Sequence, residues 1–399
     1  MYKPSQEILD KYADVLVNFA LGSGKGIEKG EVVLLQVPEC AKPMLLSLQK
    51  AVLKAGGHYI VNYLPDETAR NFYELAEDHQ LEFFPEKMLR GRVEEMDHMI
   101  HIEATTNLKE LEGIHPAKIL KKDKSHGLYR VWREQKENEG KFTWCIALYG
   151  TQQMADEAEL SIEEYWGQII KACYLDKKNP VEEWKKAFDE IERVLGVLNS
   201  MKIEKLHVKS KNVDLSVGIG KNRKWLGGSG RNIPSFEIFI SPDWRGTNGK
   251  VSFDQPLYRY GNLIDGIILE FKDGKIINSS ANKGEEILKE MIATENADKI
   301  GEFSLTDSRL SKIDKFMAET LFDENFGGKF GNFHIALGSA YKDSYPGDAS
   351  RVSKEEWERM GFNESVVHTD IVSSYDREVN VYLEDGSKKL IYKEGKFVI

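Results

Sequence analysis

The segment from residue 30 to residue 65 alternates between strand-like and helix-like patterns, and this alternation constrains the fold more than any other feature of the chain. The run "GEVVLLQVP" (30–38) is apolar and rich in valine, which is typical of a buried strand. It is followed by "KPMLLSLQKAVLKAGG" (42–57), which has helical spacing and ends in two glycines, and by the strand-like "HYIVNYLP" (58–65). Two strands joined through a helix pair in parallel. The first half therefore predicts an α/β domain with a mostly parallel sheet covered by helices.

The second half of the chain has a different pattern, in which short apolar runs are separated by Asp-Gly and Glu-Gly pairs. These runs are "VDLSVGIG" (213–220), "KVSFDQPLYRYG" (250–261), "LIDGIILEFKDGKIIN" (263–278) and "REVNVYLEDGSKKLIYKEGKFVI" (377–399). Such pairs are typical of hairpin turns, so we expect mainly antiparallel strands. Helical spacing interrupts them in "KGEEILKEMIATEN" (283–296) and "SKIDKFMAETLF" (311–322). The second half therefore predicts a mainly antiparallel α+β domain.

A long helix is predicted between the two patterns, in "NPVEEWKKAFDEIERVLGVLNSMK" (179–202), which begins at an Asn-Pro signal. The chain has 399 residues, more than most single domains contain, so two domains are expected. Because the pattern changes after this helix, we expect an N-terminal domain of residues 1–205 and a C-terminal domain of residues 206–399.

The charge and cysteine content exclude several classes of partner. The formal net charge is -10, which argues against binding to nucleic acid or to an anionic membrane surface. No run approaches the roughly 18 apolar residues that a membrane span needs. Cys40, Cys145 and Cys173 form no close pair, so neither a disulfide framework nor a zinc knuckle is expected. These features predict a cytoplasmic protein without nucleic-acid or membrane partners.

Histidines and acidic residues beside apolar runs are the candidates for chemistry. His368 and Asp370 lie two positions apart in "NESVVHTDIV" (363–372), so in a strand both side chains project to the same face. The other candidates in similar surroundings are Glu237, Glu302, Glu324, His334 and Tyr341. Each also has an ordinary interpretation as a solvated strand residue, an edge charge, a helix-end residue or a half-buried aromatic.

Taken together, these carboxylates and imidazoles suit a centre with two divalent ions. Such a centre activates water and polarises a carbonyl group. Oxygen and imidazole donors without a thiolate favour zinc, cobalt or manganese over iron–sulfur clusters or copper–thiolate sites. The candidates spread from residue 237 to residue 370, however, and spacing alone does not show that they converge.

Five segments occur in an order that resembles one known family. They are "RNIPSFEIFISPD", "IGEF", "LFDEN", "HIALGSAY" and "NESVVHTD". In this order they resemble the aminopeptidase T/aminopeptidase S family of dinuclear metallopeptidases, and "GTQQMADEAELSIEEYWGQIIKACYLD" (150–176) is similar in the first half. The resemblance thus covers nearly the whole chain. It implies a metal-dependent aminopeptidase that releases N-terminal amino acids from peptides, with residues 206–399 as the catalytic domain, and it implies a homodimer.

The resemblance also assigns roles to the candidate residues. The implied metal ligands are Glu237, Glu302, Glu324, His334, His368 and Asp370, with Glu302 bridging the two ions. Tyr341 is implied to assist catalysis, and either Glu237 or Glu302 is expected to carry the proton of the attacking water. One departure is the Gly-rich "NFGGKFGNF" between Glu324 and His334, which is longer than in the shorter members. A loop lengthens at little entropic cost, so His334 is still expected to act as a ligand.

Two other functions are compatible with a metal centre of this kind. A dinuclear phosphoesterase would need a cation to clamp the phosphoryl group, and Arg231 and Lys342 are candidates. A non-catalytic metal-binding protein would instead close the coordination sphere of a structural ion. The aminopeptidase is the function predicted here, because every ligand implied by the resemblance is present.

Overall fold

The computed structural model describes residues 2–259 and 262–399 of the chain. It divides into two compact units: unit 1 comprises Met1–Trp184 and Ser229–Ile233, and unit 2 comprises Lys185–Gly228 and Pro234–Ile399. The boundary predicted between residues 205 and 206 stays a prediction, because compactness alone does not show which parts of a chain fold independently.

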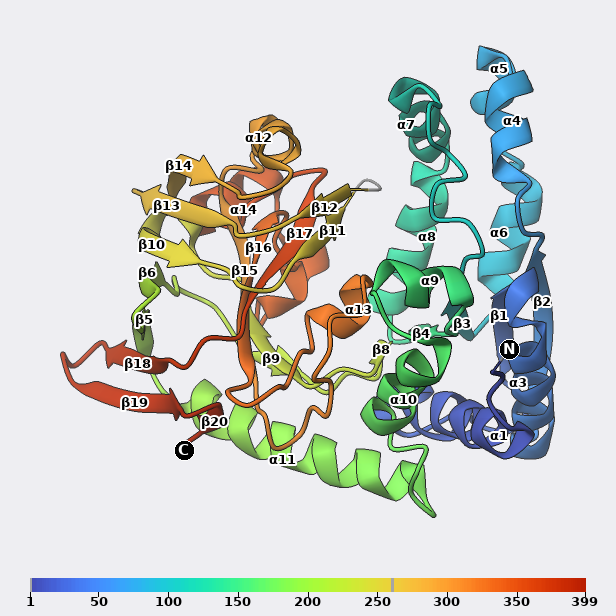
Figure 1. The fold of residues 1–399 in the computed structure, drawn as a ribbon, viewed down its shortest axis with the longest axis horizontal. Coiled ribbons are helices and arrows are strands. Elements are labelled where there is room, and N and C mark those ends of the chain that lie inside the picture. The colour runs from blue at the N-terminus through green and yellow to red at the C-terminus, as the bar shows by residue number, and fades with distance from the viewer. Residues whose placement is uncertain (1, 260–261) are drawn as a thin grey trace. The chain divides into compact units, whose positions relative to one another are not determined.

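Unit 1 contains a five-stranded sheet in which every pair of neighbouring strands is parallel (Figure 1). Its strands, in spatial order, are β2 (His58–Leu64), β1 (Val32–Pro38), β3 (His98–Glu103), β4 (Thr143–Leu148) and β8 (Asn232–Ile233). Helix α3 (Lys42–Ala55) joins β1 to β2 and ends at Gly56, whose φ of 85° lies in the left-handed region that glycine tolerates. The predicted β-α-β arrangement is therefore confirmed.

The remaining helices of unit 1 vary widely in length. They are α1 (Gln6–Val15), the π-helical turn Leu16–Ala20, α2 (Leu21–Gly24), the 3-10 turn Glu39–Ala41, α4 (Ala69–Leu75), α5 (Asp78–Leu81), α6 (Glu86–Glu95), α7 (Pro116–Ser125), α8 (Gly127–Asn138), α9 (Gln152–Glu157) and α10 (Ile162–Ala172). The predicted long helix is α11 (Pro180–Ser200), which begins in unit 1 and continues in unit 2. In residues 2–259 and 262–399, no helix is both long enough and apolar enough to cross a membrane.

Unit 2 is built mainly from antiparallel strands, as predicted. An eight-stranded sheet has the order β14 (Lys275–Ser280), β13 (Ile268–Lys272), β10 (Asn248–Ser252), β6 (Val213–Gly218), β5 (Ile203–Lys209), β18 (Glu378–Leu383), β19 (Lys388–Lys393) and β20 (Lys396–Phe397). A five-stranded sheet has the order β17 (His368–Ser373), β16 (Asn332–Gly338), β15 (Ile300–Thr306), β9 (Glu237–Ile240) and β7 (Leu226–Gly227). Strands β11 (Leu257–Arg259) and β12 (Asn262–Ile264) form a separate pair. The helical segments are α12 (Glu285–Ala293), α13 (Thr320–Asp323), α14 (Lys354–Met360) and the 3-10 turns Trp244–Gly246, Lys342–Ser344 and Ala349–Arg351.

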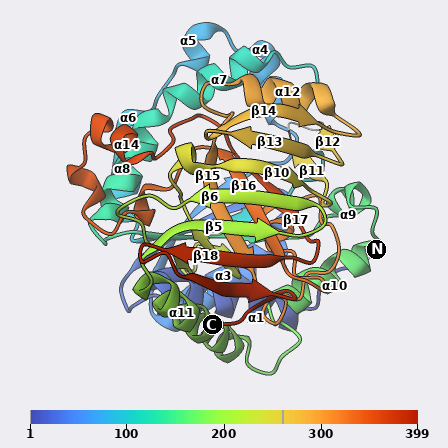
Figure 2. The same cartoon turned by 90° about the vertical axis from the view of Figure 1, so that its left-hand side faces the viewer.

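The two large sheets of unit 2 pack face to face, and Figure 2 shows β15, β16 and β17 behind the eight-stranded sheet. Every residue of β15 and β16 is buried; Phe303 and Phe333 lie on the face toward the eight-stranded sheet, and their rings lie 6.1 Å apart. Phe333 also contacts Phe253, which follows β10, at 6.2 Å, and Arg377, which precedes β18, at 5.5 Å. One face of the five-stranded sheet therefore forms the core, and the opposite face is left for other side chains.

The helix predicted over residues 311–322 is wrong for most of its length. Only α13 (Thr320–Asp323) is helical, and Ala318 has a φ of 51°, outside the helical region. The Asp323 carboxylate accepts hydrogen bonds from the amides of Met317 at 2.7 Å and Glu319 at 3.0 Å. The carboxylate thus replaces the carbonyl groups that a helix would offer to these amides, an alternative that aspartate provides readily.

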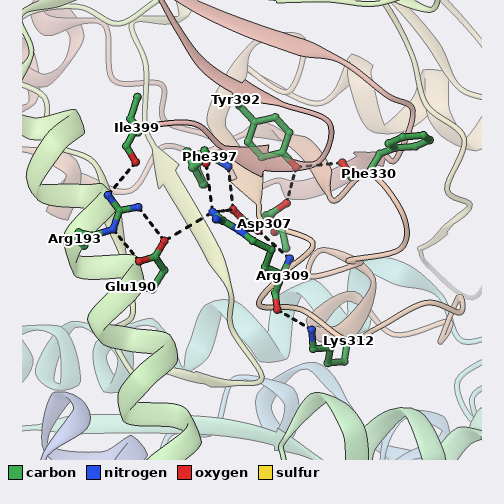
Figure 3. A network of polar contacts seen from close by, with 10 residues as sticks. Glu190, Arg193, Asp307, Arg309, Lys312, Phe330, Tyr392, Phe397 and Ile399 are labelled. Carbon is green, nitrogen blue, oxygen red and sulfur yellow. Dashed lines mark hydrogen bonds and ion pairs between the residues drawn. The ribbon is translucent and has the colours of Figure 1, made fainter.

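A polar network anchors the C-terminal end of unit 2 (Figure 3). Asp307, with 2% of its surface exposed, accepts hydrogen bonds from the amide of Phe397 at 2.9 Å and from the guanidinium of Arg309 at 2.6 and 2.9 Å. Arg193 of α11 pairs with Glu190 at 2.8 Å and donates to the carbonyl of Ile399 at 2.9 Å. Asp307 comes directly after β15, so the network connects the end of this central strand to the C-terminal strand.

We expect Asp307→Ala to lower the free energy of unfolding by about 1–3 kcal/mol, because the buried Phe397 amide loses its acceptor. The matched control is Asp385→Ala, which removes an exposed carboxylate that accepts from the amide of Ser387. The control is expected to change stability by less than about 0.5 kcal/mol. Urea unfolding followed by circular dichroism measures the free energy of unfolding of both variants. Equal losses in the two variants would show that the buried network stabilises the protein no more than an exposed hydrogen bond does.

Candidate metal centre

The register of neighbouring strands puts the predicted ligands on one face of the five-stranded sheet. In the β15–β16 ladder Glu302 pairs with Ala336, and in the β16–β17 ladder Ala336 pairs with Asp370. Paired residues share a face, as do residues two positions apart in a strand. His334 precedes Ala336 by two positions and His368 precedes Asp370 by two, so both imidazoles lie on this same face.

The two remaining acidic candidates reach the cluster from β9 and from the end of α13. Glu237 is the first residue of β9 and pairs with Thr306, which lies on the same face of β15 as Glu302. Glu324 directly follows α13 and is 9% exposed. The structure therefore brings together candidates that are far apart in the sequence.

His334 lies at the centre of the cluster and is completely buried. Its Nε2 atom is 3.2 Å from Oε1 of Glu302, 3.4 Å from Oε2 of Glu237 and 3.8 Å from Oδ1 of Asp370. One donor atom from each of Glu237, Glu302 and His334 lies within 4.8 Å of the others. Donors that share a zinc ion at about 2.1 Å stand about 3–4 Å apart. The spacing of this cluster is thus compatible with a shared ion.

The electrostatics of the cluster favour the binding of a cation. Burial raises the pKa of the Glu302 carboxyl to about 7; the hydrogen bond with His334 opposes this rise, and the charges of Glu237 and Asp370 add to it. Burial, followed by the charges of Glu237 and Asp370, raises the pKa of Glu324 well above its ordinary value. In the described part of the chain, Glu237, Glu302 and Asp370 form ion pairs with histidines and not with lysine or arginine. A divalent cation would offset this concentration of negative charge.

The two imidazoles are held differently. Burial alone would lower the pKa of His334, but hydrogen bonds with Glu237 and Glu302 outweigh it and hold the pKa well above its ordinary value. The resulting imidazolium charge balances the carboxylates, as a bound cation would, and a cation would release this proton. The Nδ1 atom of His368 donates to the carbonyl of Ser339 at 2.8 Å, which fixes the tautomer. In the neutral imidazole this leaves the lone pair of Nε2, which lies 3.6 Å from Oδ1 of Asp370, available to a metal ion. This is the arrangement of a metal-binding histidine.

Tyr341 lies beside the cluster and is 44% exposed. Its ring centroid is 4.8 Å from that of His368 and 5.8 Å from that of Phe239. Burial of the phenol, and then the charges of Glu302 and Asp370, raise its pKa well above the ordinary value. The hydroxyl therefore keeps its proton and is available to donate a hydrogen bond.

Asn325 is a residue of the site that the sequence analysis did not identify. It is completely buried, and its Oδ1 atom accepts from the amide of Phe236 at 2.6 Å. Its Nδ2 atom donates to the carbonyl of Leu321 at 3.1 Å and to Oε1 of Glu324 at 3.4 Å. Asn325 thus joins the segment that leads to Glu237 to the segment that carries Glu324. The one feature of the sequence that could have pointed to Asn325 is its position directly after Glu324.

The long segment between Glu324 and His334 closes on itself. The side chain of Asn332 donates to the carbonyl of Glu324 at 3.0 Å and to that of Phe326 at 2.6 Å. The amides of Gly327 and Gly328 donate to the carbonyl of Ile313 at 2.8 and 3.0 Å. These contacts allow Glu324 and His334 to lie in one cluster despite the extra residues between them.

The two cations considered as phosphoryl clamps have other contacts. Arg231 forms an ion pair with Glu137 at 2.9 Å and lies over the ring of Trp144 at 5.7 Å. Lys342 lies 5.7 Å from the ring of Trp357. Arg231 is thus engaged by a carboxylate, whereas Lys342 is exposed and contacts an aromatic ring.

Comparison with known proteins agrees with the metal-binding character of the site. The model of the family described as thermophilic metalloprotease (M29) matches residues 5–397. The chain is 29% identical to aminopeptidase PepS of Streptococcus thermophilus, covering 99% of this chain and 98% of that protein. It is 28% identical to aminopeptidase T of Thermus thermophilus, covering 96% and 98% respectively. The solved structure of wild-type AmpT from Thermus thermophilus is similar, with a TM-score of 0.85, 26% identity and coverage of 99% of this chain and 100% of that chain.

We expect Asn325→Ala to weaken the binding of zinc or cobalt by about 10–100-fold, because residues that orient metal ligands commonly have effects of this size. The matched control is Asn199→Ala, since the amide of Asn199 holds the backbone of Trp225 at 2.8 and 3.1 Å instead. Calorimetric titration of the metal-depleted variants measures the affinity, and circular dichroism checks the fold. Wild-type affinity in a folded Asn325→Ala variant would contradict a positioning role.

Proposed function

The chain belongs to the thermophilic metalloprotease (M29) family, and we propose that it is an aminopeptidase that removes single residues from the free N-terminus of peptides. The observation that carries this proposal is the cluster of four carboxylates and two imidazoles that converge from four strands and the end of α13. The names of the relatives, aminopeptidase PepS and aminopeptidase T, support the same activity.

We assign two divalent ions to this cluster. The proposed ligands are Glu237, Glu302, Glu324, His334, His368 and Asp370. Glu302 is the proposed bridge, because it lies on β15 between the strands that carry Glu237 and His334. Oxygen and nitrogen donors without sulfur suit zinc, cobalt or manganese.

The ions would lower the pKa of a bound water and polarise the carbonyl group of the scissile peptide bond. Glu237 or Glu302 would accept the proton of the attacking water and pass it to the leaving amine. The side chain of Glu237 is 13% exposed and that of Glu302 is 4% exposed, so Glu237 has the better access to solvent. Tyr341 would donate a hydrogen bond to the oxygen that becomes negatively charged.

A free α-amine would bind one of the ions or an acidic side chain of the cluster, and this contact would account for the choice of a free N-terminus. An acetylated N-terminus is larger, and its amide nitrogen has no free lone pair for a metal ion and no positive charge for a carboxylate. A cytoplasmic location and a homodimer also belong to this proposal and stay predictions.

We expect the protein to hydrolyse leucine anilide but not N-acetylleucine anilide, because only the first carries a free α-amine. Removal of metal with a chelator is expected to abolish the hydrolysis, and addition of cobalt or zinc to restore it. Release of the aniline is measured by absorbance. Cleavage of both substrates, or of neither after metal is restored, would contradict an aminopeptidase.

Substitution of a residue that only supports a metal ligand weakens metal binding by about 10–100-fold. We expect His368→Ala and Asp370→Ala to weaken metal binding by more than this, because each removes a proposed ligand. Both variants are expected to lose activity and to keep the fold. The matched controls are His207→Ala and Asp214→Ala, which break another pair of histidine and aspartate, 2.7 Å apart. Metal content by mass spectrometry and anilide hydrolysis are the two measurements. Retained metal and activity in either site variant would remove that residue from the ligand set.

A further inference from the structure

We propose that unit 1 contains a second binding site, at the C-terminal ends of β1, β3 and β4, and that its ligand is a free amino acid with an apolar side chain. The site shares no residue with the metal centre. The proposal depends on the topology of the parallel sheet, on a cavity at one of its edges and on the side chains that line that cavity.

The order of the strands marks the edge at which a ligand is expected. From β1 the chain passes through α3 to β2 on one side of β1, whereas β3 pairs on the other side of β1. The connection that follows β1 therefore leads toward one edge of the sheet, and the connection that follows β3 leads through to β4, toward the other edge. In open parallel sheets, ligands bind outside the carboxyl ends of the strands at such a point.

A cavity of about 380 Å³ lies at this edge. Cys40 follows the end of β1, Thr106 follows the end of β3, and Gly150 follows the end of β4, and all three line the cavity. Its volume falls in the roughly 300–1,000 Å³ range of small-molecule sites. The cavity thus occupies the place that the topology predicts.

The inner wall of the cavity is aromatic and apolar. Tyr149 and Trp166 line it, with ring centroids 5.1 Å apart and planes at 81°, and Ile162 lines it as well. The indole of Trp166 donates to the carbonyl of Gly150 at 3.1 Å, which satisfies the one polar atom of that ring. A Cβ atom at Gly150 would lie 2.8 Å from the ring of Tyr165, so glycine is needed for this packing. The wall suits an apolar side chain of the ligand.

The lining also carries one charge of each sign on exposed residues, Lys3 and Asp156. The side chain of Gln152, which also lines the cavity, donates to Oδ1 of Asp156 at 2.7 Å and orients it. An α-amino acid presents a carboxylate and an ammonium group on one carbon, with its side chain pointing away. Lys3 complements the carboxylate and Asp156 the ammonium, while the side chain meets the aromatic wall.

This ligand is also the kind of molecule that the proposed reaction releases, so the site would respond to product. The binding itself does not rest on the proposed function. A protein that fails to hydrolyse peptides is still expected to bind the amino acid.

The test is calorimetric titration of the full-length, metal-loaded protein with L-leucine. We expect saturable binding that Lys3→Gln and Asp156→Asn each weaken by at least about 10-fold, since each removes a charged partner of the ligand. The matched control is Glu159→Gln, an exposed acidic residue that does not line the cavity, and it is expected to bind like the wild type. His368→Ala is also expected to keep the binding, because His368 belongs to the metal centre.

Three analogues test which groups of the ligand are recognised. Leucinamide lacks the carboxylate, 4-methylpentanoate lacks the amine, and glycine lacks the side chain, so each is expected to bind at least about 10-fold more weakly than leucine. The proposal is overturned if leucine does not bind, if both charge variants bind it normally, or if His368→Ala alone abolishes the binding.

Discussion

The two-residue period of the strands β15, β16 and β17 is the constraint on which unit 2 depends. On one face of these strands Phe303 and Phe333 pack in the interior, and on the other face Glu302 and His334 meet Asp370. A shift of one residue in the register would exchange the two sets, placing carboxylates in the core and phenylalanines in the site. The core and the candidate metal centre are therefore specified by the same ladders.

This arrangement places several ionisable carboxylates close together in a buried part of the protein, where charged groups are rare. Burial and neighbouring carboxylates raise the pKa of both Glu302 and Glu324, which means that keeping the ionised groups together costs free energy. The surrounding structure must be stable enough to hold them. The hydrogen bond from the buried Phe397 amide to Asp307, at the end of the strand that carries Glu302, is one of the contacts that supply this stability. In many domains a functional site that destabilises the fold is offset by stabilising contacts elsewhere in the same domain.

Much of the fold could be predicted from local sequence patterns. The candidate ligand set could be predicted only from the resemblance to a known family. The strand–helix–strand pattern of residues 30–65 and the hairpin signals of the second half depend on neighbouring residues, and the structure confirms both. The helix expected over 311–322 failed because Asp323 binds the amides of Met317 and Glu319, a competition that apolar spacing does not reveal. The convergence of Glu237 with Asp370 depends on strand register, which includes an irregularity between Ile300 and Glu302. Pairings of that kind cannot be read from one sequence.

The proposed ligands also differ in how firmly they are held. Glu302 and His334 belong to strands that pair with a neighbour on both sides, and Asp370 belongs to the edge strand β17, whose ladder with β16 fixes its register. Glu324 lies instead in an irregular segment, where the amides of Asn325 and Asn332 provide the support. Side chains on regular strands keep their positions more accurately than side chains on loops. Among the proposed ligands, Glu324 is therefore the one whose position can adjust most readily, because its support comes from side chains of an irregular segment and not from a strand ladder.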